Sequence, residues 1–110
     1  AAGMRKEWGP SVVRVTADDP LFAGLDETIL VEQRHFWELK TAPTGFARLA
    51  ASDACAVQAI RHESRPLWGL QFHPERYSER YPDGRIVLAN FFRLAGLAAS
   101  RAEAGALARA

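Results

Sequence analysis

Five short segments of the chain carry the hydrophobic pattern of β-strands. They are rich in β-branched and other apolar residues, and combinations of glycine, proline and aspartate that favour turns separate them. The segments span residues 11–16, 28–33, 46–51, 56–61 and 67–72. The last of these, Leu-Trp-Gly-Leu-Gln-Phe, is almost entirely apolar, which is typical of a strand covered on both faces.

The last third of the chain has a helical pattern instead. From Asp83 onward the apolar residues recur at helical spacing and fall on one face, namely Val87, Phe91, Leu94, Ala95 and Ala98. Asp83 is suited to the N-cap and Gly96 to the helix stop. Residues 97–110 are rich in alanine and have no clear pattern, so they form either a helical extension or a frayed tail.

The predicted order, short strands followed by one long helix, points to the α/β class. A strand that is nearly all apolar needs helices on both faces of its sheet, but the chain offers one long helix. Its 110 residues suit one small domain or part of a larger one. We therefore expect half of an α/β layer structure, completed by elements that are not in this sequence.

Composition narrows the possible partners and cofactors. A formal charge of +1 gives no electrostatic reason to expect nucleic acid or an anionic membrane as partner. No apolar run approaches the length of a membrane span, which is about 18 residues. One cysteine excludes an intrachain disulfide framework, and we expect a reducing, cytoplasmic setting. The three histidines have no metal-ligand spacing, so we expect no metal site. We also expect no cofactor.

The candidate chemistry follows the apolar strand, in the triplet His73-Pro74-Glu75. In open α/β sheets, ligands bind just beyond the carboxyl ends of strands. Proline stiffens the turn, so the Glu75 carboxylate can accept the ring N–H of His73 and leave the other ring nitrogen as a base. This is the base and orienter of a triad built on a nucleophile. From the triplet alone, a capping histidine beside a solvated glutamate is the competing interpretation.

A longer string, Gly-Leu-Gln-Phe-His-Pro-Glu at residues 69–75, resembles the G-[VL]-Q-F-H-P-E signature of class I glutamine amidotransferase domains. Further segments resemble the same family in the same order: 3–10, 20–25, 31–37, 43–52 and 90–92. The resemblance covers residues 1 to about 97. It implies a flavodoxin-like domain that hydrolyses glutamine with a Cys–His–Glu triad, in which His73 and Glu75 are the second and third members.

The nucleophile that the resemblance implies is not in this sequence. The family carries it in a Gly-x-Cys-x-Gly elbow, which needs small residues around a tight turn. Cys55 has no flanking glycines, and we expect it to be structural. Residues 1–97 are thus expected to be the C-terminal part of the domain and 98–110 an extension, with the N-terminal half, which carries the cysteine, as partner. The sequence is compatible with a fragment, a degenerate product or a split subunit.

The resemblance also implies a substrate and a partner. Arg34, Phe36 and Trp37 lie by position where related domains meet the amino-acid end of glutamine, whereas His35 is as easily a packing residue at a strand end. The complete domain would hydrolyse the glutamine side-chain amide through a cysteine thioester and pass ammonia to a synthase domain or subunit. The alternatives are a hydrolase of γ-glutamyl compounds and a non-catalytic binding or regulatory module of the same fold.

Overall fold

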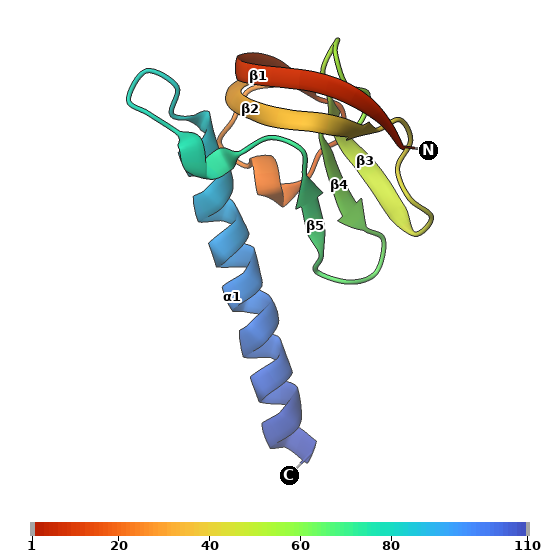
Figure 1. Cartoon of the computed structure of the whole chain (residues 1–110). Helices are drawn as coiled ribbons and strands as arrows, with labels where there is room; N and C mark the ends of the chain where they lie inside the picture. Colours follow the sequence, from red (N-terminus) through yellow and green to blue (C-terminus); the bar gives the residue numbers. More distant parts are fainter. Residues whose placement is uncertain (1, 110) are drawn as a thin grey trace.

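In the computed structural model, the described residues 2–109 form five strands, two short 3-10 helices and one long α-helix (Figure 1). The structure describes residues 2–109, and among the side chains those of residues 8–35 and 38–96. The strands are β1 (Ala2–Val15), β2 (Thr28–Leu39), β3 (Phe46–Ala51), β4 (Ala59–His62) and β5 (Trp68–Leu70). The 3-10 helices are η1 (Pro20–Phe22) and η2 (Pro74–Arg76), and the α-helix is α1 (Asp83–Arg109).

The strands form a single antiparallel sheet in the order β2-β1-β3-β4-β5. The sheet curls, and the segment after β5 returns to β2, where His73 bridges to Glu32. Figure 1 shows β1 and β2 arching over the smaller strands, with η1 lying inside the curve. The chain that leaves β5 is therefore held against the outer edge of β2.

The strand predictions hold in number and order, with different bounds. β3 spans the predicted residues, while β1 and β2 are longer because they pair over almost their whole lengths. The turn before β3 places Gly45 at φ +86°, and the N–H of Phe46 donates to the carbonyl of Pro43 at 3.0 Å. A turn with this positive φ at its third residue favours glycine.

The strand predicted at residues 67–72 is shorter in the structure, and within the described part of the chain it is covered only in part. β5 has three half-buried residues, and Leu67 keeps 49% of its surface exposed. β5 is also antiparallel to its neighbour β4. Two apolar residues of the segment pack within the chain: Trp68 lies edge-on against Phe91, and Phe72 is buried in the core.

Helix α1 begins at Asp83, as predicted, but it does not end at Gly96 and continues to Arg109. Glycine inside a helix costs about 1 kcal/mol relative to alanine. The alanine-rich sequence that follows has a high helix propensity, which explains why the helix continues. Through residue 109 the chain continues as part of α1, which projects beyond the sheet (Figure 1).

The core lies between the inner face of the sheet, η1 and the first turns of α1. Its buried residues are Val13, Leu21, Phe22, Ile29, Val31, Leu49, Ala50, Ala59, Phe72 and Val87. Helix α1 is fastened to η1 by Asn90, whose Nδ2 donates to the carbonyls of Leu21 and Ala23, each at 2.9 Å. A buried amide that donates to two backbone carbonyls fixes how α1 is oriented against η1 and how closely the two helices approach.

Candidate active site

His73 lies where the chain leaves β5 and meets the edge of β2. Its backbone N–H donates to the carbonyl of Glu32 at 2.9 Å. Its own carbonyl accepts from the N–H of Arg76 at 3.2 Å, which closes the short helix η2. Because proline at the first position of η2 fixes φ, the residues on either side of Pro74 are held in a defined relation.

The side chains of His73 and Glu75 meet, as the spacing predicts. Nδ1 of His73 lies 2.5 Å from Oε1 of Glu75. An ionised carboxylate only accepts hydrogen bonds, so Nδ1 is the protonated ring nitrogen. In the neutral ring, Nε2 then carries the lone pair. The turn thus presents a histidine in one tautomer, oriented by a carboxylate.

The environment of Glu75 favours its ionised form. Burial acts to raise the pKa of the Glu75 carboxyl. The hydrogen bond from His73 lowers this pKa, as do the backbone N–H of Glu75 and the charges of His73 and Arg76. The net result is a pKa below the ordinary value of 4.5. The orienting group is therefore charged throughout the neutral range.

Nε2 of His73 faces the edge of β2, 3.3 Å from the carbonyl oxygen of Arg34. This carbonyl can accept a hydrogen bond from the Nε2–H when the ring is an imidazolium. Sequence reasoning missed both backbone acceptors on β2, the carbonyls of Glu32 and Arg34. Backbone groups leave no mark in a sequence, and only the strand pairing could have revealed them.

The three predicted substrate residues fall on β2, and the backbone carbonyl of one of them, Arg34, contacts the ring of His73. The Arg34 guanidinium lies 5.4 Å from the ring centroid of Trp8, its partner across the β1–β2 pair, and its Nε is 4.0 Å from the Glu32 carboxylate. The backbones of Phe36 and Trp37 continue the strand, but their side chains lie outside the described residues. His35 is buried, with 9% of its surface exposed.

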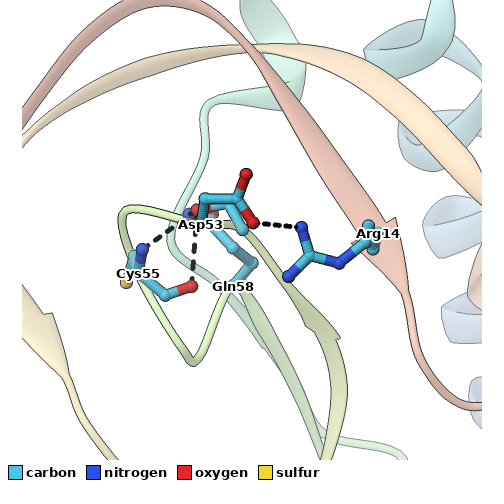
Figure 2. Close-up of polar contacts among 5 residues, drawn as sticks. Arg14, Asp53, Cys55 and Gln58 are labelled. Atoms are coloured by element: carbon cyan, nitrogen blue, oxygen red, sulfur yellow. Dashed lines mark hydrogen bonds and ion pairs between the residues drawn. The ribbon is translucent and has the colours of Figure 1, made fainter.

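Cys55 lies in the loop between β3 and β4 and is 1% exposed. Its Sγ donates to the carbonyl of Val57 at 3.4 Å, and its backbone N–H donates to Oγ of Ser52 at 3.1 Å. Figure 2 shows Cys55 and Gln58 in this part of the structure, together with the Arg14–Asp53 ion pair. A buried thiol that points into its own loop fits the predicted structural role.

His62 forms part of a turn. Its Nδ1 accepts from the backbone N–H groups of Ser64 and Arg65, at 3.1 and 3.0 Å. Among the described residues, no group of three or more His, Cys, Asp or Glu side chains is arranged to hold a metal ion. Within the same part of the chain, no helix has the length and apolar character needed to cross a membrane.

With this geometry in place, comparison with known sequences identifies the class of protein. The sequence pattern of the family described as "Glutamine amidotransferase class-I" matches residues 4–95. The chain therefore belongs to the class I glutamine amidotransferase family, which confirms the resemblance carried by residues 69–75.

Particular relatives make the likeness more specific. The chain is 48% identical over 82 residues to a glutamine-hydrolysing GMP synthase subunit of Archaeoglobus fulgidus, a match that covers 74% of the chain and 44% of the relative. It is 41% identical over 97 residues to the protein of the same name from Methanopyrus kandleri, which covers 87% of the chain and 50% of the relative. The chain spans about half the length of the relatives it matches.

Solved structures agree. A crystal structure of a Thermoplasma acidophilum protein assigned as a GMP synthase subunit matches with a TM-score of 0.79 and 32% identity, covering 96% of the chain and 51% of that protein. The glutaminase domain of Trypanosoma brucei CTPS matches with a TM-score of 0.60 at 22% identity, covering 86% of the chain and 40% of that protein, and shows the fold alone. The predicted α/β fold, as part of a class I glutamine amidotransferase domain, is confirmed.

Proposed function

We propose that this chain supplies the general base and its orienting carboxylate to a site that hydrolyses the side-chain amide of glutamine. The observation that carries the proposal is the 2.5 Å contact between Nδ1 of His73 and Glu75, with Nε2 turned to the edge of β2. A neutral imidazole held in one tautomer is suited to accept a proton at Nε2. Membership of the family supports the choice of reaction.

In this mechanism Nε2 of His73 takes the proton of a cysteine thiol. The thiolate attacks the amide carbon of glutamine, and the resulting imidazolium is stabilised by Glu75 and by the carbonyl of Arg34. The imidazolium then protonates the leaving nitrogen, so ammonia departs and a thioester remains. Nε2 next accepts a proton from water, whose oxygen attacks the thioester. Glutamate is released when the proton passes to the sulfur.

The nucleophile is proposed to come from the other half of the domain. The 110 residues contain no Gly-x-Cys-x-Gly elbow, and Cys55 is buried in its own loop. Residues 1–97 would then form the C-terminal part of the domain, and residues 98–110 would be an extension beyond it. That the chain matches about half of each relative is consistent with this division.

The edge of β2 beside His73 is the proposed place for the amino-acid end of glutamine. Arg34, Phe36 and Trp37 lie along it, and Arg34 is the one among them with a described side chain. The contact with Trp8 and the nearby Glu32 limit the directions that its guanidinium can take. A fixed guanidinium is suited to a carboxylate. Arg34→Ala should raise KM for glutamine more than it lowers kcat.

The ammonia is proposed to pass to a synthase domain or subunit. The relatives carry the name of a glutamine-hydrolysing GMP synthase subunit, so we favour a GMP synthase as the setting.

Release of ammonia from glutamine by the complete domain tests the proposal. His73→Ala should lower kcat by several orders of magnitude, because the thiol loses its proton acceptor. His62→Ala is the matched control, since it removes the same ring from a turn outside the site. The melting temperature of each variant separates loss of chemistry from loss of fold. If His73→Ala kept most of its activity while Cys55→Ser lost it, the assignment of the catalytic pair would be wrong.

A further inference from the structure

The outer edge of β2 receives contacts from two separate parts of the chain. His73 uses the carbonyls of Glu32 and Arg34 through its N–H and its Nε2. Two residues before Glu32, the N–H of Leu30 donates to Oδ2 of Asp83 at 2.8 Å, and Asp83 is the first residue of α1. The same strand edge therefore holds the candidate base and the start of the helix.

The start of the helix also touches the turn between His73 and Glu75. Gly84 is buried, and a Cβ built on it would lie 2.4 Å from the carbonyl oxygen of Pro74 and 3.0 Å from its Cα. Both of these are backbone atoms, which a rotamer change cannot move. The backbone of α1 thus lies directly against the backbone of Pro74, at a distance that only glycine permits.

We propose that Asp83 and Gly84 are positioning residues for the His73–Glu75 pair, an inference that rests on the proposed glutaminase function. Asp83 fixes the first turn of α1 to the edge of β2, and Gly84 lets that turn press Pro74 toward the same edge. Because Pro74 joins His73 to Glu75, the helix start sets where Nε2 lies along β2. Neither residue touches the reacting atoms.

A methyl group at position 84 would displace the catalytic turn. An ordinary contact of at least 3.4 Å requires the two backbones to separate by about 1 Å. A misplacement of about 1 Å at a catalytic group can cost about 10²-fold in rate. Gly84→Ala should therefore lower kcat by about that factor and leave KM for glutamine within about threefold, because the transition state loses more than the bound substrate does.

The matched control is Gly96→Ala, in the same helix. A Cβ at Gly96 meets nothing within 4 Å, so this variant gains the same helix propensity without a clash. Both variants are compared in the complete domain by steady-state kinetics and by the proton NMR signal of the His73 Nδ1–H, which His73→Ala identifies. We expect Gly84→Ala to lose kcat and shift the signal, and Gly96→Ala to do neither. Equal kcat and an equal signal in the two variants would overturn the proposal.

The Asp83 variants decide the question if Gly84→Ala does not fold. Asp83→Asn keeps an acceptor for the N–H of Leu30, whereas Asp83→Ala removes it. We expect the asparagine to retain most of the wild-type kcat and Nδ1–H signal and the alanine to lose both, and identical behaviour of the two would overturn the role of Asp83. A wild-type domain that shows the Nδ1–H signal but releases no ammonia would refute the proposed function. In that case, comparing the Nδ1–H signal between the variants and the wild type would still test whether Asp83 and Gly84 position His73.

Discussion

Replacing Glu75 by glutamine tests the orienting carboxylate without removing its shape. The amide introduced by Glu75→Gln can still offer an oxygen to Nδ1 of His73, as the carboxylate does at 2.5 Å. The charge that stabilises the imidazolium is lost, and the amide group can rotate to present its NH₂ and favour the wrong tautomer. The chemical step should therefore suffer while substrate binding does not.

The size of the effect follows from the charge interaction. Two unit charges about 4 Å apart attract by about 1 kcal/mol in water and about 4 kcal/mol at an effective dielectric constant of about 20. The side chains of His73 and Glu75 are 39% and 54% exposed, so solvent screens the pair and the value lies between these limits. At 1.36 kcal/mol per tenfold, kcat should fall by about 5-fold to about 900-fold. An analogous change in a serine protease triad costs about 10⁴-fold, which sets an upper bound.

The assay is steady-state release of ammonia from glutamine by the complete domain, with kcat and KM determined separately. Glu79→Gln is the matched control, because it removes the same charge from an exposed residue of the same segment. We expect KM to stay near the wild-type value in both variants and kcat to fall only in Glu75→Gln. If the two variants had the same kcat, Glu75 would not be the orienting group.

Three further predictions follow from the site and the surface. Cys55→Ser should leave turnover of the complete domain nearly unchanged, and a loss as large as that of His73→Ala would make Cys55 the nucleophile. Because the pKa of Glu75 is lowered in the folded state, its charge contributes fully to folding stability above pH 4.5. This contribution is lost only as the pH falls through the lowered pKa. A carboxyl ¹³C NMR titration with its midpoint at or above pH 4.5 would contradict this. The 110-residue chain alone should release no ammonia from glutamine, and a measurable glutaminase rate would refute this. It should also self-associate, because Phe92 is 67% exposed, and a monodisperse monomer with a sharp melt would refute that expectation.

Features that depend on neighbours in the sequence were predictable from it. The signature at residues 69–75 identified the family, and the spacing of His73 and Glu75 predicted their hydrogen bond because one stiff proline separates them. The start of α1 at Asp83 and the bounds of β3 followed from apolar periodicity. These are short-range effects, which composition and spacing express directly.

Local sequence pattern does not reveal contacts made where the chain folds back on itself. Gln33 lies in a predicted strand, yet its side chain is fully buried and donates to Gln58 and Ser11, at 2.9 and 3.1 Å. The apolar run of residues 67–72 became a short, half-buried strand. Both outcomes depend on the curl of the sheet, which brings together strands that are distant in the sequence.

The position of the candidate base was likewise decided by tertiary structure. The carbonyls of Glu32 and Arg34 receive His73 only because β2 is an edge strand, whose outer backbone groups are open to other parts of the chain. The close contact of Gly84 with Pro74 requires the helix and the turn to pack backbone to backbone. The sequence determined which side chains form the pair, and the packing of α1 and β2 determined where that pair is held, because backbone contacts between distant segments have no counterpart in local sequence pattern.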